Sequence, residues 1–198
     1  MTETEQVEAE DEAAAEPADP ELEARRDFAL AQVRQYPDSA LRMRAREVEE
    51  FGEPLERLVG RMIRLMNDAC GVGLAAPQVG VLQRILVYQA DPESDAVALV
   101  NPSIVSGSPE VETGEEGCLS LARATVTVDV ERSSTVTVEG CGADGAAVRI
   151  EADGLEARVL QHEIDHLDGV LIIDRTSAEE RKRALGELRP APQLGRAR

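Results

Sequence analysis

Both histidines of the 198-residue chain lie in one short stretch, residues 155–169, and this stretch restricts the fold more than any other. His162 and His166 are four residues apart with Glu163 beside the first, in the pattern His-Glu-x-x-His. On an α-helix this spacing puts both imidazoles on one face, about one turn apart, where they can bind one cation. The apolar residues around them are Val159, Leu160, Ile164 and Leu167. This pattern favours a buried metal-binding helix, with Gly169 as its C-cap, over an exposed helix with incidental histidines.

Two imidazoles leave a hydrolytic centre incomplete, because such centres usually use three protein ligands and one open position. Cys118, in the stretch EEGCLS, is a candidate third ligand, and Gly117 before it would let the backbone approach a crowded centre. Taken alone, Cys118 could also be a small buried hydrophobic residue. Cys70 falls on the apolar face of a predicted helix and is assigned to the core, and Cys141, in a glycine-rich turn, receives no role.

The three cysteines are an odd number, and no basic-then-apolar signal segment opens the chain. No apolar run approaches the roughly 20 residues of a membrane helix. We therefore expect a soluble protein of a reducing cytoplasm.

The chain has a net charge of −18, and ten acidic residues within residues 1–24 account for more than half of it. This composition predicts a disordered acidic tail over residues 1–25, although a tail that binds a basic partner is the alternative. The acidic balance argues against direct nucleic-acid binding, which needs clustered Lys and Arg.

Helices are predicted at residues 27–35, from Pro54 to Gly71, and at residues 177–188, where Ser177 is followed by Glu180 as in a capping box. Strands are predicted at residues 84–89, on either side of Pro102 (97–101 and 104–105), and at 125–130, 135–138 and 148–151. Because strands and helices do not alternate regularly, we expect an α+β fold with antiparallel β-sheets packed around the central metal-binding helix.

Three stretches, GVGLAAPQ (71–78), EGCLS (116–120) and QHEIDH (161–166), resemble the signature motifs of the peptide deformylases, in the same order. The resemblance extends over most of residues 30–180. We expect a catalytic domain over residues 26–176, followed by a C-terminal helix and frayed tail over residues 177–198. It implies the same fold and the removal of the formyl group, as formate, from the N-terminal formyl-methionine of newly made polypeptides.

The resemblance also implies the roles of single residues. One divalent ion per chain, Fe²⁺ in most members and otherwise Zn²⁺, Ni²⁺ or Co²⁺, would be held by Cys118, His162 and His166. Glu163 would move the proton of the attacking water, and the Gln78 amide and the Leu119 N–H would stabilise the oxyanion.

Peptide binding is expected on three parts of the chain. The resemblance places an added peptide strand along Val72, Gly73 and Leu74, and Glu116 is a further candidate for substrate binding. Helical spacing puts Leu155, Arg158 and Val159 on the face of His162, where they would line the methionine pocket, although core packing is the alternative for Leu155 and Val159.

Asp165 should point away from the metal, and we hypothesise that it shares Arg132 with Glu116. One departure is that Leu121 is followed by Ala122 where family members commonly have proline, which affects peptide contacts of this loop rather than the metal ligands.

Two alternative functions explain part of the sequence. A His-Glu-x-x-His metalloprotease would not account for GVGLAAPQ, and an inactive deformylase-like binding protein would be expected to have lost a ligand or the carboxylate. N-formyl-Met nascent peptides are the expected partners, together with possible ribosome association, no membrane or nucleic-acid binding, and a monomeric state.

Overall fold

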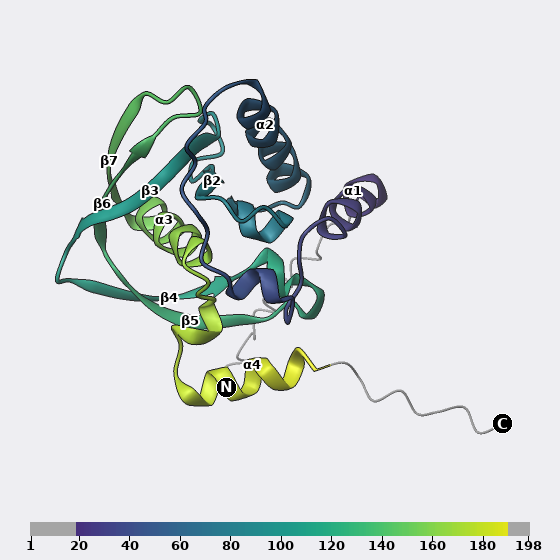
Figure 1. Cartoon of the computed structure of the whole chain (residues 1–198). Helices are drawn as coiled ribbons and strands as arrows, with labels where there is room; N and C mark the ends of the chain where they lie inside the picture. The colour runs from purple at the N-terminus through teal and green to yellow at the C-terminus, as the bar shows by residue number, and fades with distance from the viewer. Residues whose placement is uncertain (1–18, 190–198) are drawn as a thin grey trace, which may run out of the picture.

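The computed structural model of the protein describes residues 19–189, without the side chains of residues 122–124. Helix α3 (Gly154–Leu167) lies at the centre, between two antiparallel sheets (Figure 1). The larger sheet has the strand order β1-β2-β3-β6-β7, formed by Gly73–Ala75, Ile85–Tyr88, Val97–Gly107, Thr135–Cys141 and Ala147–Asp153. The smaller sheet pairs β4 (Val111–Gly117) with β5 (Thr127–Ser133). The α+β fold and the central helix predicted from the sequence are confirmed.

Helix α3 is held by its apolar side and by a sharp stop at its C-terminal end. Val159, Leu160, Ile164 and Leu167 are all buried and pack against the inner face of the five-stranded sheet. Gly169 follows the helix with a φ of +76°, and its N–H donates to the His166 carbonyl. Because only glycine adopts this backbone conformation easily, Gly169 ends the helix as predicted, although the C-cap itself is Asp168, one residue earlier.

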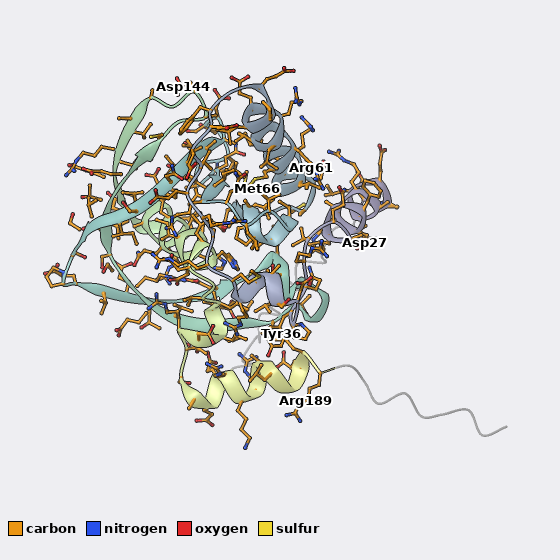
Figure 2. The ribbon with its side chains drawn as sticks, in the orientation of Figure 1. Asp27, Tyr36, Arg61, Met66, Asp144 and Arg189 are labelled. Atoms are coloured by element: carbon orange, nitrogen blue, oxygen red, sulfur yellow. The ribbon has the colours of Figure 1, made fainter. Side chains whose placement is uncertain are left out.

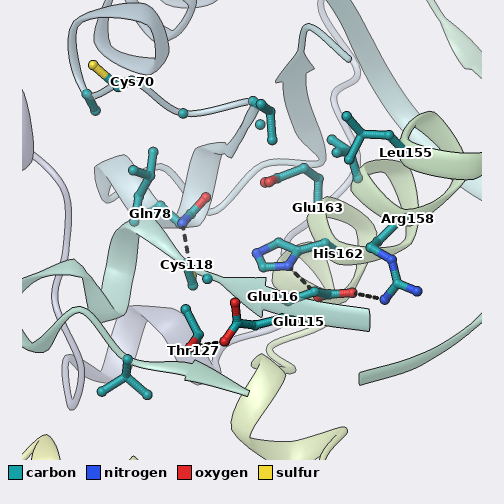
Figure 3. Close-up of a pocket in the computed structure, with 18 of the residues that line it drawn as sticks. Cys70, Gln78, Glu115, Glu116, Cys118, Thr127, Leu155, Arg158, His162 and Glu163 are labelled. Carbon is teal, nitrogen blue, oxygen red and sulfur yellow. Dashed lines mark hydrogen bonds and ion pairs between the residues drawn. The ribbon is translucent and has the colours of Figure 1, made fainter. Parts of the chain in front are cut away.

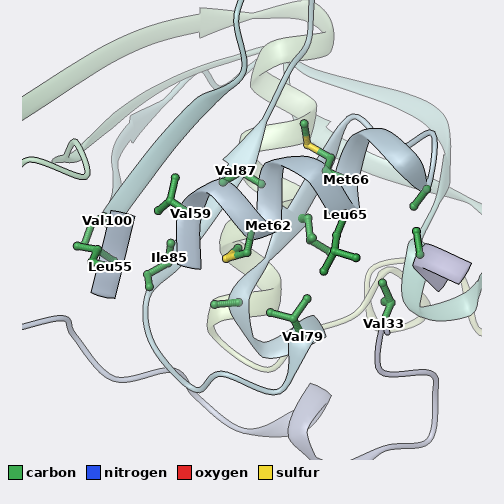
Figure 4. Packing of buried hydrophobic residues seen from close by; sticks show 14 of the residues in the cluster. Val33, Leu55, Val59, Met62, Leu65, Met66, Val79, Ile85, Val87 and Val100 are labelled. Carbon is green, nitrogen blue, oxygen red and sulfur yellow. The ribbon is translucent and has the colours of Figure 1, made fainter. Parts of the chain in front are cut away.

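Strand β2 is buried on both faces because a helix covers each of them. Leu86 and Tyr88 pack with the cluster around α3, whereas Ile85 and Val87 pack with the cluster under α2 (Glu53–Asp68) (Figure 4). The apolar run that predicted a buried strand here therefore reflects two opposite contacts at successive residues. The same alternation places β1, and the site beside it, between α2 and α3.

A third cluster lies beneath the β4–β5 hairpin and includes α4 (Ala178–Glu187) (Figure 1). The Ser177 side chain accepts a hydrogen bond from the Glu180 N–H, as predicted. The Glu180 carboxylate, however, accepts from the Asp129 N–H at 2.7 Å, so that it attaches α4 to β5 instead of completing a capping box.

The first helix differs from the prediction. Helix α1 spans Pro20–Leu30 rather than residues 27–35, and Figure 2 shows Asp27 on it. Asp19 accepts a hydrogen bond from the Glu21 N–H, and Pro20 has the φ that a first turn requires. The tail predicted to be disordered over residues 1–25 is therefore shorter than expected, since residues 20–25 are helical. Residues 1–18 of that tail, and residues 190–198 of the predicted C-terminal tail, lie outside the described residues.

Two strand predictions also need correction. Residues 97–107 form one long strand and not two, because a register shift against β6 between Val100 and Ser103 spans Pro102 and absorbs its missing donor. A second register shift lies between Ile104 and Ser106. Strand β4 was not predicted, since its sequence VETGEEG contains two glycines and few apolar residues.

Cys70 was assigned to the core, and this was wrong. Helix α2 ends at Asp68, and Cys70 has a φ of +55°, which turns its side chain off the apolar face of the helix and leaves it exposed. Among residues 19–189, none of the helices is long and apolar enough to cross a membrane.

The stop after α3 yields a prediction. A Cβ at residue 169 would lie 2.7 Å from the Arg42 carbonyl oxygen, whereas one at Gly186 in α4 would meet nothing within 4 Å. Gly169→Ala should lower the free energy of unfolding by about 1–3 kcal/mol. Gly186→Ala should leave it unchanged or raise it by up to about 1 kcal/mol. Urea denaturation measures both, and equal effects would contradict the steric argument.

Candidate metal centre

The three predicted ligands converge although they come from distant parts of the chain. Cys118 lies between the end of β4 and the short 3₁₀ helix η3 (Leu119–Ala124), and His162 and His166 project from α3. Their ligand atoms all lie within 4.8 Å of one another, and the Cys118 Sγ is 3.2 Å from the His166 Nε2. One thiolate and two imidazoles form a donor set that suits a divalent transition metal. The residues present therefore fit the ion that the sequence implies.

Glu116 orients His162. Its Oε2 accepts a hydrogen bond from the His162 Nδ1 at 2.9 Å, which leaves the Nε2 of that ring for the centre (Figure 3). The same carboxylate accepts two hydrogen bonds from Arg132, at 2.8 and 2.9 Å, and one from Arg158 at 2.9 Å. Burial opposes its ionisation, but the hydrogen bonds from Arg132 and His162 outweigh this and hold the pKa of Glu116 well below its usual range.

Arg132 connects the cysteine strand to the metal-binding helix, as hypothesised from the sequence. Besides Glu116 on β4, it binds Asp165 on α3 with an Nη1–Oδ2 distance of 2.7 Å. Asp165 points away from the ligands, and Arg175 binds it as well, at 2.6 and 3.1 Å. The hypothesis that Glu116 and Asp165 share Arg132 is confirmed.

Glu163 has a buried carboxylate that can still accept a hydrogen bond or a proton. It is 4% exposed, and within residues 19–189 its Oε2 has no hydrogen-bond partner. Burial raises the pKa of Glu163 to about 7 in the metal-free protein. Gly73 makes room for it, since a Cβ there would lie 2.3 Å from the Oε1. The close approach expected at Gly117 occurs at Gly73 instead, because a Cβ at Gly117 would make only an ordinary 3.6 Å contact.

The side-chain amide of Gln78 is fixed beside Cys118. Its Oε1 accepts from the Ala75 N–H at 2.8 Å, and its Nε2 donates to the Ser120 Oγ at 3.1 Å and lies 3.8 Å from the Cys118 Sγ. The Leu119 N–H makes no hydrogen bond to any described residue. Both groups expected to bind an oxyanion are therefore donors next to the ligands.

A cavity of about 400 Å³ opens onto this centre, and Figure 3 shows Glu163, His162, Gln78 and Cys118 around it. Of the expected peptide-binding residues, those that line the cavity are Val72, Gly73, Glu116, Leu155, Arg158 and Val159. The Leu74 side chain does not line it, because alternation along β1 turns it into the core under α2.

Two of the residues expected to bind the peptide, Glu116 and Arg158, use their charged groups for other contacts. The guanidinium of Arg158 binds Glu116 and also the carbonyls of Val130 and Glu112, at 3.0 and 2.8 Å. Gly114 gives it space, since a Cβ there would lie 3.1 Å from the Arg158 Cζ. Arg158 therefore offers the cavity its aliphatic stem, as expected, while its charge attaches α3 to the hairpin.

The open edge of β1 faces the cavity. On the opposite edge β1 pairs with β2, and the Val72 carbonyl accepts from the Gln89 N–H at 2.9 Å. Because backbone groups alternate between the two edges, the N–H and carbonyl of Gly73 point away from β2. An extended peptide can add there as a further strand.

The sequence interpretation missed three residues. Ser120 holds Gln78 and could have been suspected from its place two residues after Cys118. Arg175 supports Asp165. Arg26, on α1, lines the cavity, and no local pattern indicates this.

The contact between Glu116 and His162 predicts a loss of metal affinity in Glu116→Gln. Removing such a support of a metal-binding histidine typically weakens metal binding about 10- to 100-fold, as measured by competition with a chelator. Glu115→Gln is the matched control, since the neighbouring Glu115 is exposed and its carboxylate accepts from the Thr127 hydroxyl at 2.8 Å. An equal loss in both variants would show that charge, and not orientation, controls affinity.

The lowered pKa of Glu116 predicts how stability depends on pH. Because the pKa in the folded protein lies below its usual 4.5, the ionised carboxylate stabilises the fold above that pH, and the contribution is lost as the pH falls towards the folded value. In metal-free Glu116→Gln, the free energy of unfolding should therefore fall less steeply than in wild type from about pH 5 to about pH 3. Parallel slopes in urea denaturation would contradict this.

Comparisons with known proteins agree with the geometry. The family model described as polypeptide deformylase matches residues 30–182. A peptide deformylase of Thermotoga neapolitana is 48% identical over 152 residues, covering 77% of this chain and 90% of the relative, and one of Thermodesulfovibrio yellowstonii is 43% identical over 158 residues, covering 78% and 94%.

Solved structures agree as well. A crystal structure of peptide deformylase from Thermotoga maritima is 46% identical, with a TM-score of 0.70, and covers 73% of this chain and 96% of that one. A crystal structure of a peptide deformylase from Legionella pneumophila is 40% identical, with a TM-score of 0.74. The match covers 79% of this chain and 91% of the Legionella chain. The chain with this centre therefore belongs to the polypeptide deformylase family.

Proposed function

We propose that Cys118, His162 and His166 hold one divalent metal ion and that the residues around it carry out the reaction of the family. The reaction follows from family membership: the chain is an enzyme that removes the formyl group from the N-terminal formyl-methionine of new polypeptides and releases formate. The observation that carries our assignment of the residues is the buried, unpartnered oxygen of Glu163 beside three converging ligands. A metalloprotease and an inactive binding protein are not favoured.

Ferrous iron is our proposal for the ion, inherited from the family resemblance. The donor set of one thiolate and two imidazoles would equally accept Zn²⁺, Ni²⁺ or Co²⁺. When bound, the ion would supply a Lewis acid that lowers the pKa of a water towards about 7.

Glu163 is proposed to move the proton. Its Oε2 is free to accept a proton from the attacking water, and the same carboxyl can then deliver that proton to the leaving nitrogen. Burial favours proton uptake by this carboxylate, because removal from water raises the pKa of Glu163 in the metal-free protein. Gly73 supports it by leaving the space that the carboxylate occupies.

The Gln78 amide and the Leu119 N–H are proposed to stabilise the negative charge that develops on the formyl oxygen. Gln78 is held by Ala75 and Ser120 before any substrate arrives, so that its amide need not reorganise during the reaction. The Leu119 N–H has no competing acceptor among the described residues. Removing one such donor typically costs about 10²- to 10³-fold in rate.

The peptide is proposed to add to the open edge of β1 at Gly73, beside the exposed Val72 side chain, whereas the backbone of Leu74 faces β2 and is not available to it. Leu155, Val159 and the stem of Arg158 would then form the wall of the methionine pocket. Glu116 was predicted to bind the peptide, but its carboxylate already binds Arg132, Arg158 and His162. We propose that it orients His162 instead. Ribosome association, a monomeric state and a cytoplasmic location stay predictions.

The proposal predicts a selective loss of turnover in Glu163→Gln. This change keeps the shape of the side chain but removes the base, so kcat should fall by about 10²- to 10⁴-fold while the bound metal remains. Formate release from a formyl-Met peptide and metal content, both measured under anaerobic conditions, test this. Glu156→Gln is the control, because Glu156 lies on the same helix and binds the Tyr88 hydroxyl at 2.7 Å. Undiminished turnover in Glu163→Gln would refute the assigned role.

A further inference from the structure

We infer that Arg26 makes this enzyme favour nascent peptides with an acidic side chain within the first few residues after the methionine. Arg26 lies on α1 and lines the same cavity as the metal centre. It precedes residue 30, where the match to the family model begins. The inference rests on the proposed function and concerns its substrate preference.

Helix α1 is fixed where it can present Arg26 to the cavity. Ala29 and Leu30 are buried in the cluster under α2. The neighbouring Arg25 binds Asp68, at the end of α2, with an Nη2–Oδ1 distance of 2.8 Å. These contacts hold the exposed Arg26 near the C-terminal end of α2, and residues 69–72, which follow that end, also line the cavity.

Arg26 is a cation without a partner in the part of the chain described here. No hydrogen bond or ion pair joins it to any residue from 19 to 189. The other guanidinium that lines the cavity, that of Arg158, is bound to Glu116 and to backbone carbonyls. Arg26 is therefore the cavity cation, among described residues, that can still receive a carboxylate.

The course of the peptide brings its later residues towards Arg26. The reacting end must lie at Gly73, because that residue abuts Glu163. Gln78, which lies beyond the C-terminal end of β1, closes the site on that side. A peptide added along β1 therefore continues past Val72 towards Cys70, both of which are exposed. Arg26 also lines the cavity, and the Arg25 next to it binds Asp68, two residues before Cys70.

The charge of the whole protein makes a local cation significant. With a net charge of −18, the chain as a whole repels an acidic peptide. At physiological ionic strength this repulsion is screened beyond about 8 Å, so the charge nearest to the peptide has most influence. An exposed Arg–carboxylate pair contributes modestly, which corresponds to a preference of about two- to fivefold.

The test compares peptides that differ in a single charge. The iron-loaded full chain is assayed for formate release from formyl-Met-Ala-Ala-Ala amides that carry Asp, Asn or Lys at each position after methionine in turn. At one or more positions, kcat/KM should be about two- to fivefold higher for Asp than for Asn, mainly through KM. The preference should decrease as salt is raised.

Two variants locate the effect. Arg26→Gln should abolish the preference for Asp, and Arg26→Glu should reverse it in favour of Lys. The matched control is Arg61→Glu, which changes the net charge equally but lies on α2, away from the cavity lining; Figure 2 labels Arg61. Circular dichroism of each variant verifies folding.

The outcomes separate this inference from the proposed function. If wild type releases formate from all peptides but treats Asp and Asn alike at every position, Arg26 has no such role. If Arg61→Glu changes the preference as much as Arg26→Glu does, net charge is responsible and the inference is wrong. If wild type releases no formate from any peptide, the proposed function itself fails.

Discussion

The arrangement of the metal centre depends on the buried guanidinium of Arg132. It lies on β5, binds Glu116 on β4 and binds Asp165 on α3, so that three elements meet at one charged group. Burying a charge is costly, and a buried ion pair can contribute little net stability compared with apolar packing. Its role here is geometric, because it fixes the position of β4, which precedes Cys118, relative to α3, which carries both histidines. Loss of the guanidinium would remove the group that binds both buried carboxylates, leaving Glu116 to Arg158 and His162 and leaving Asp165 to Arg175.

Close packing around β1 also helps to position the groups of the metal centre. The strand is covered by α2 on one face and by α3 on the other, yet one edge stays open to the cavity. Gly73 combines two requirements, because its missing side chain admits the Glu163 carboxylate while its backbone remains available at the edge. A side chain there would displace the Glu163 carboxylate, since its Cβ would lie 2.3 Å from the Oε1.

Local periodicity was sufficient to predict some features and not others. Helix α3 was predicted from the four-residue spacing of His162 and His166 and from the apolar residues around them. The rotation per residue of a helix also predicted that Asp165 points away from the metal ligands, and it binds Arg132 there. The role of Cys118 needed the family resemblance, since a lone cysteine carries no spacing of its own. Strand β4 was missed because its pairing with β5, and not its own composition, makes it a strand.

Cys70 and Arg26 show a different limit. Cys70 was predicted on the apolar face of the helix, but α2 ends two residues before it and a left-handed backbone turns its side chain outwards. Arg26 reaches the cavity only because α1 packs on α2, which no short-range pattern encodes. Both depend on tertiary contacts.

The separation of the ligands along the chain has a further consequence. Cys118 and His166 are 48 residues apart, and the hairpin and the helix that carry them are distinct elements. In an unfolded chain the entropy of closing such a loop opposes simultaneous ligation, so an ion that engages all three side chains acts as a reversible cross-link, much as a disulfide does. The cation proposed to activate water would thereby also reinforce the native topology, and metal starvation would affect the lifetime of the protein as well as its turnover.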